Sequence, residues 1–90
     1  FNISVRTNLL DRSAVIGWVT DEFSDSMVRY STSESFGADV KVVANTNMTK
    51  NHELTIDNLS IGTLYYFEVR SKDAAGNIGV SSTGRIFLSI

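Results

Sequence analysis

The sequence predicts an all-β fold, a seven-stranded antiparallel β-sandwich. Apolar and polar residues alternate along several short segments, and this alternation has the period of a half-buried strand. Asn, Asp and Gly residues, which favour tight turns, separate these segments at near-regular spacing. No segment of helical length carries an apolar stripe with the helical period. A chain of 90 residues fits one such fold, so we expect residues 1–90 to form a single domain.

The first three strands are predicted from the phase of their side chains. Residues 3–8 alternate apolar or β-branched residues with polar ones. Residues 14–20 and 26–31 follow, and their in-phase sets include Trp18 and Tyr30. The β-branched and aromatic residues of these segments fit a pleated surface. We therefore expect Trp18 and Tyr30 to lie in the core.

The next two predicted strands are shorter or interrupted. Residues 40–44 form an apolar run around Lys41. Residues 53–59 carry spaced apolar residues that end, after a break, at Leu59.

The last two strands complete the predicted sandwich. Residues 64–71 place Tyr65, Phe67 and Val69 on one face, and residues 85–90 close the chain. Together, the expected core residues are Trp18, Tyr30, Leu59, Tyr65, Phe67 and Val69.

Polar segments between these strands predict loops. These segments are 9–13, 21–25, 32–39, 45–51, 60–63, 73–79 and 81–84. We expect each of them to connect separate strands.

The composition excludes several classes of function. The chain has no Cys, which removes disulfides, thiol catalysis and cysteine metal sites. Its net charge is −2 with scattered charges, so we expect no nucleic-acid binding. The apolar runs are too short for membrane insertion, and no residue pattern calls for a cofactor. The absence of a starting Met suggests a domain excised from a larger multidomain protein.

The segment Leu-Ser-Ile-Gly-Thr-Leu-Tyr-Tyr-Phe-Glu-Val, residues 59–69, resembles the E–F corner of the fibronectin type III family. By that resemblance Tyr65 is the tyrosine-corner residue, with its hydroxyl bonded to backbone a few residues upstream. Residues 13–18, 28–30 and 73–77 resemble strand B, strand C and the F–G loop of the same family. The chain departs from the family pattern because it has no Pro, and Ile61 stands where the corner usually has one.

The resemblance also implies a class of function. The segments 18–22, 28–30 and 73–77 are similar to repeats in secreted or surface proteins of bacteria and archaea. Such modules commonly lie beside polysaccharide-degrading enzymes or in surface-layer proteins. The resemblance therefore implies an extracellular, monomeric spacer or accessory module that is not an enzyme, with neighbouring domains of the same polypeptide as its partners.

A binding module is the alternative function. The side chains with the opposite phase to the core would form a face on the outside of the C–F–G sheet: Met27, Arg29, Tyr66 and Phe87. This face, or the B–C and F–G loops, could bind polysaccharide or a surface protein.

An enzyme is the third and most remote hypothesis. His52 is the only histidine, and we expect it to be a solvent-touching residue at the start of strand E. Asp21, Glu22 and Asp25 form an acidic cluster that fits solvated loop charge better than a catalytic pair. Asp73 and Asn77 fit the turn chemistry of a loop. No catalytic or metal-ligand set is therefore predicted.

Overall fold

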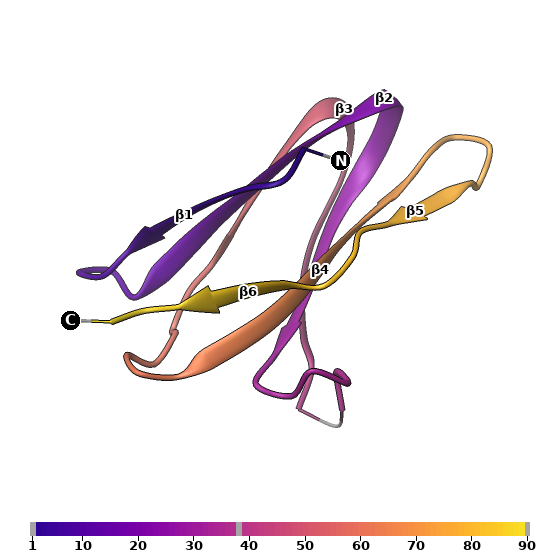
Figure 1. The fold of residues 1–90 in the computed structure, drawn as a ribbon. Helices are drawn as coiled ribbons and strands as arrows, with labels where there is room; N and C mark the ends of the chain where they lie inside the picture. The colour runs from indigo at the N-terminus through magenta and orange to yellow at the C-terminus, as the bar shows by residue number, and fades with distance from the viewer. Residues whose placement is uncertain (1, 38, 90) are drawn as a thin grey trace.

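The computed structural model describes residues 2–37 and 39–89, and within them every regular element is a strand. The strands are β1 (Ser4–Asn8), β2 (Ser13–Ser31), β3 (Lys41–Ile56), β4 (Leu64–Lys72), β5 (Ile78–Val80) and β6 (Gly84–Phe87). All strand pairs of the described residues are antiparallel (Figure 1). The described residues contain no helix that is long and apolar enough to cross a membrane. The predicted all-β, antiparallel class is confirmed.

The prediction of seven separate strands is wrong in its detail, because the described residues form six. The predicted loops 21–25 and 45–51 are strand instead, so β2 and β3 each join two predicted strands. The reason is that the two arms of the β2–β3 hairpin keep pairing through a shared bend, where Ser24 lies opposite Thr49. The register shifts on both sides of Ser24, so the pairing of the two arms is irregular through the bend.

The predicted loop 73–79 also contains part of a strand. Asp73 closes a tight turn early, since its Oδ1 accepts the backbone N–H groups of Ala75 and Asn77. The chain can therefore turn back and pair as β5, with Ile78 opposite Lys72. The last predicted strand, 85–90, is shorter in the structure because β6 ends at Phe87, and Ile90 lies outside the described residues.

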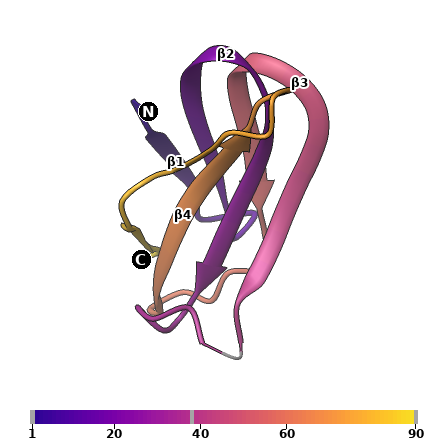
Figure 2. The same ribbon diagram turned by 90° about the vertical axis from the view of Figure 1, so that its right-hand side faces the viewer.

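The bent hairpin distributes its two arms over two layers. The first part of β2 pairs with β1 and with the second part of β3. The second part of β2 pairs with the first part of β3 and with β4, which in turn pairs with β5 and β6. Figure 2 shows these layers from the side, with β2 and β3 curling from one into the other. The result is a β-sandwich with an immunoglobulin-like arrangement.

The core lies between the two layers. All six expected core positions are buried there: Trp18, Tyr30, Leu59, Tyr65, Phe67 and Val69. Buried residues of both layers complete it: Ala14, Ile16, Val28, Leu54, Ile56, Ile86 and Leu88. Trp18 also joins the layers through a polar contact, because its Nε1–H donates to Ser71 Oγ at 2.9 Å. Within the described part of the chain, every buried side-chain nitrogen and oxygen has a hydrogen-bond partner.

The E–F corner contains the hydrogen bond that the family resemblance implies. The Ser60 N–H donates to the Tyr65 hydroxyl at 2.8 Å, so the buried ring keeps its polar end satisfied. Gly62 adopts φ +80°, which disfavours other residues, and its N–H donates to Leu88 O at 2.7 Å. This contact fixes the corner against the last part of the chain without a Pro.

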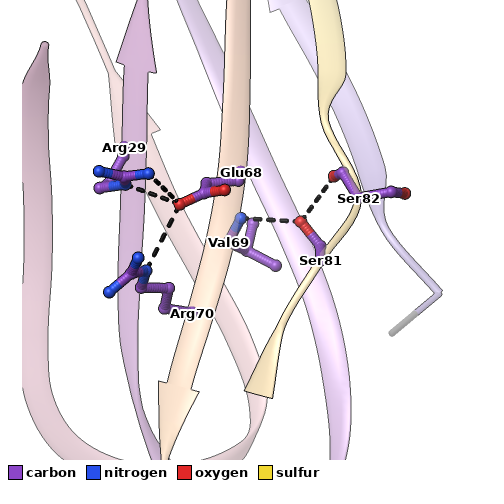
Figure 3. Close-up of polar contacts among 6 residues, drawn as sticks. All are labelled: Arg29, Glu68, Val69, Arg70, Ser81 and Ser82. Atoms are coloured by element: carbon purple, nitrogen blue, oxygen red, sulfur yellow. Dashed lines mark hydrogen bonds and ion pairs between the residues drawn. The ribbon is translucent and has the colours of Figure 1, made fainter. Parts of the chain in front are cut away.

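β6 can pair with β4 because its first residue is glycine. A Cβ at Gly84 would lie 2.5 Å from the Phe67 ring, which is closer than non-bonded atoms can approach. Just before β6, Ser81 continues the β5–β4 contact through its main chain and side chain. Its N–H donates to Val69 O at 3.0 Å, and its Oγ accepts the Val69 N–H at 2.9 Å (Figure 3).

Candidate interaction face

The outer face is the set of side chains of the second layer that point away from the core. Register and alternation place these residues on it: Met27, Arg29, Val42, Leu64, Tyr66, Glu68, Arg70, Lys72, Ile78, Val80, Arg85 and Phe87. Along β4 they alternate with the buried Tyr65, Phe67 and Val69, as a strand with one buried face requires.

The four residues that the sequence assigned to a binding face all belong to the outer face. Met27, Arg29 and Tyr66 are half-buried, and Phe87 is 53% exposed. The two aromatic rings are not directly opposite each other, because Tyr66 pairs with Arg85 and Phe87 pairs with Leu64. They are therefore diagonal neighbours, at a distance that large side chains can span.

The centre of the outer face is an ion-pair network around Glu68. Arg29 lies directly opposite Glu68 across the β2–β4 pair, and its Nε donates to Glu68 Oε1 at 2.7 Å. Its Nη2 contacts the same oxygen, and Arg70 Nε lies 3.4 Å from it (Figure 3). Glu68 is buried, and the two guanidinium groups supply hydrogen-bond donors to its carboxylate. The network holds both arginines in defined positions.

Arg85 lies over the ring of Tyr66, the one tyrosine of the outer face. Its guanidinium carbon lies 6.0 Å from the centre of the Tyr66 ring, at the limit of a cation–π contact. Arg85 therefore covers part of one face of the Tyr66 ring, and Tyr66 is only half-exposed. It is a poor platform for stacking a sugar.

Sequence reasoning missed several members of the outer face. The alternation along residues 64–71 predicts that Glu68 and Arg70 share a side with Tyr66, but it does not predict their contact with Arg29. That contact depends on the β2–β4 register, and these strands are separated in the chain by all of β3. Ile78 and Val80 were missed because β5 lies in a segment with turn composition.

Positive charge is concentrated on the outer face. Arg29, Arg70, Lys72 and Arg85 are four of the eight Lys and Arg residues of the chain. Glu68 is one of ten Asp and Glu residues, and Asp25 borders the face with its Oδ1 bonded to the Lys72 N–H. The face is thus cationic on a chain whose net charge is −2.

His52 lies in the interior, and the expectation of a solvent-touching residue is wrong. It is 3% exposed and stacks on Trp18, with ring centres 5.0 Å apart. Its Nδ1 is 2.7 Å from Ser26 Oγ and its Nε2 is 2.9 Å from Thr20 Oγ1. Burial lowers the pKa of His52 below its ordinary value of 6.5, and the Asp25 carboxylate opposes part of this shift. His52 is buried because the bend of the β2–β3 hairpin folds the Ser and Thr hydroxyls of β2 around it.

The contact between Ser26 and His52 resembles part of a nucleophile–base pair, but its setting does not suit catalysis. Ser26 is 4% exposed, so a substrate carbonyl could not reach its hydroxyl. Both ring nitrogens of His52 face hydroxyl groups, and none of its hydrogen bonds is to a carboxylate. The arrangement fits a buried polar network better than a catalytic site.

A polar depression of about 320 Å³ lies at the end of the sandwich that carries the bend and the F–G loop. Its lining residues are Thr20, Glu22, Ser24, Ser71, Asp73, Asn77, Ile78 and Gly79. Hydrogen bonds from the backbone and side chain of Asn77 lower the pKa of Asp73, so this carboxylate is committed to the turn. The described residues contain no group of three His, Cys, Asp or Glu side chains that could hold a metal ion.

Known structures share this fold at low sequence identity. One, described as a myokine structure, has a TM-score of 0.79 and 18% identity, and the match covers 99% of this chain and 94% of the other. The FN1–FN3 domains of chicken CNTN1 give a TM-score of 0.73 and 19% identity. That match covers 99% of this chain but only 31% of the longer CNTN1 chain. These similarities show a fibronectin type III-like fold.

A comparison with the curated proteins finds no match. A comparison with family models gives a match that spans residues 2–86, to the family described as purple acid phosphatase, N-terminal domain. The match includes the E–F corner, the bent hairpin and nearly all of the outer face. The chain therefore belongs to the family of purple acid phosphatase N-terminal domains.

Proposed function

We propose that this chain is a non-catalytic accessory domain that precedes the catalytic domain of a phosphatase. The observation that carries the proposal is the family match over residues 2–86, because the family is described as the N-terminal domain of a phosphatase. In this arrangement the rest of the polypeptide hydrolyses the phosphate ester, and this domain sets the position of its neighbour.

The buried His52 network supports a non-catalytic role. General acid–base chemistry needs a titratable group within reach of the substrate. The only histidine of the chain is enclosed by Trp18 and by hydroxyl groups of β2. Its contacts serve the bend of the hairpin, and they leave no ring nitrogen facing solvent.

The direction of the outer strands supports a spacing role. Figure 1 shows that β1 and β6 run in the same general direction, so the chain enters near one end of the sandwich and leaves near the other. The extents of the molecule are 42 × 26 × 19 Å.

The comparisons change one part of the sequence-based hypothesis. They give no support to a polysaccharide-degrading parent protein, and a phosphatase replaces it in the proposal. The extracellular location and the monomeric state stay predictions from the family resemblance.

The proposal is tested by dividing the activity between the parts of the full-length protein. Hydrolysis of p-nitrophenyl phosphate is measured for the full-length protein, for the protein without residues 1–90, and for residues 1–90 alone. We expect activity in the first two and none in the third. Hydrolysis by residues 1–90 alone, lost in His52→Ala or Asp21→Asn, would show that the domain is itself an enzyme.

A further inference from the structure

The outer face has the features of a surface that is covered in the full-length protein. We infer that it docks against a carboxylate-bearing surface of the domain that follows it in the same polypeptide. The inference rests on the proposed function, because that function supplies the following domain. The apolar content of the face, the positions of its arginines and the place where the chain leaves it all favour this docking.

The outer face carries several exposed apolar side chains, although the two most exposed ones, Leu10 and Phe23, lie elsewhere. Ile78 is 57% exposed, Phe87 53% and Val42 52%. Val80 and Leu64 are also exposed on the same face. Scattered exposed apolar residues are ordinary in soluble proteins, but a group on one sheet face indicates an interaction surface.

Two of the three arginines of the outer face, Arg29 and Arg70, are held by Glu68 before any partner binds. Arg29 is fixed by two contacts to Glu68, Arg70 by a third, and Arg85 lies over Tyr66. A side chain that is ordered in advance loses less conformational entropy on binding. Aromatic residues, Met and Arg are the residue types that are enriched in protein interfaces. The guanidinium N–H groups that Glu68 does not use can bind carboxylates of a partner.

The geometry of the chain favours the following domain as the occupant. β6 is an edge strand of this sheet, and it carries both Arg85 and Phe87. Polypeptide that follows β6 therefore starts at the edge of this sheet (Figure 1). A domain attached there has a high effective concentration at this face, so a modest interface suffices for docking.

The charge of the face disfavours other occupants. A second copy docked face to face would bring two cationic surfaces together, which is unfavourable. A neutral polysaccharide would need an open aromatic platform, and Arg85 lies over the Tyr66 ring. A protein surface that bears carboxylates can pair with the cationic side chains of the face, and its apolar side chains can pack against the apolar ones.

Small-angle X-ray scattering of the full-length protein tests the inference. The variant Arg85→Glu/Phe87→Ser changes two exposed residues of β6, at the edge of the outer face where the chain leaves it. We expect an increase of several ångströms in the radius of gyration, because the domain separates from its neighbour. In the wild-type protein, high salt should give a partial increase, since the Debye length falls to about 3 Å at 1 M.

The matched control is Lys50→Glu/Phe23→Ser. These residues are likewise one exposed cation and one exposed aromatic ring, with Lys50 Nζ 5.2 Å from the Phe23 ring, but they lie at the hairpin bend. The control should leave the radius of gyration unchanged. An unchanged radius in Arg85→Glu/Phe87→Ser would overturn the inference, as would a doubled mass of the wild-type protein that the variant abolishes.

Two further measurements separate this inference from the proposed function. Phosphatase activity is measured on the same samples. If Arg85→Glu/Phe87→Ser is active and its radius of gyration equals that of the wild-type protein, the docking is rejected and the accessory role stays intact. Binding is also measured to vesicles of phosphatidylserine and phosphatidylcholine. Vesicle binding that is lost in Arg85→Glu/Phe87→Ser, without a change in radius, would assign the face to a membrane surface and overturn the inference.

Discussion

At the level of single residues, Trp18 contributes most clearly to the stability of the fold. Its side chain is 2% exposed, and it contacts the second layer through Ser71 and the β3 strand through His52. We expect Trp18→Ala to lower the free energy of unfolding by about 3–5 kcal/mol, the usual range for an emptied aromatic core site. A domain of this size has a total stability of roughly 5–13 kcal/mol, so the variant would be close to unfolding.

Urea denaturation followed by far-UV circular dichroism measures this loss. The control is Phe23→Ala, which removes an aromatic ring that is 61% exposed and should change the stability by less than about 0.5 kcal/mol. If Trp18→Ala and Phe23→Ala unfold at the same urea concentration, Trp18 does not have the structural role described here.

At the level of strands, the sequence predicts the buried residues more accurately than it predicts the pairing of the strands. Alternation identified the core side of residues 64–71 because one face of that strand is buried throughout. It did not reveal that residues 21–25 and 45–51 are strand, because most of their side chains are exposed and polar. Pairing within the bent hairpin, not side-chain burial, makes these segments extended. The Arg29–Glu68 contact was missed for the same reason, since register is a tertiary property.

The bend of the β2–β3 hairpin should make stability depend on pH through His52. Burial lowers the pKa of the folded His52, whereas the unfolded side chain titrates near 6.5. As the pH falls below about 6.5, the unfolded chain binds a proton more readily than the folded one, and the folded state loses stability. Stability is therefore complete above this pH and declines below it, by at most about 1.4 kcal/mol per pH unit.

Urea unfolding at a series of pH values between about 5 and 8 measures this dependence. We expect the slope to flatten in His52→Gln, even if the variant is less stable at every pH. This range lies above the region in which Asp39 and Asp73 contribute, because hydrogen bonds lower the pKa values of both carboxyls from 3.8. A slope that persists in His52→Gln would show that another group is responsible.

For the molecule as a whole, folding must bring together segments that are distant in the chain. Val28 of β2 lies opposite Val69 of β4, and the complete β3 strand separates them in sequence. All-β sandwiches with such pairings fold in about milliseconds to seconds, because loop closure precedes the gain from pairing. The chain has no Pro, so the isomerisation step that takes tens of seconds in other proteins has no source here.

We therefore expect refolding from urea to be a single exponential that is complete within seconds. Stopped-flow fluorescence can follow it, since Trp18 is the only tryptophan and becomes buried between the two layers. The amplitude should not depend on how long the chain was unfolded before refolding begins. A phase of tens of seconds would instead indicate a trapped state. The β2–β3 hairpin is its most direct source, because its register shifts on both sides of Ser24 would allow the two arms to pair one residue out of step.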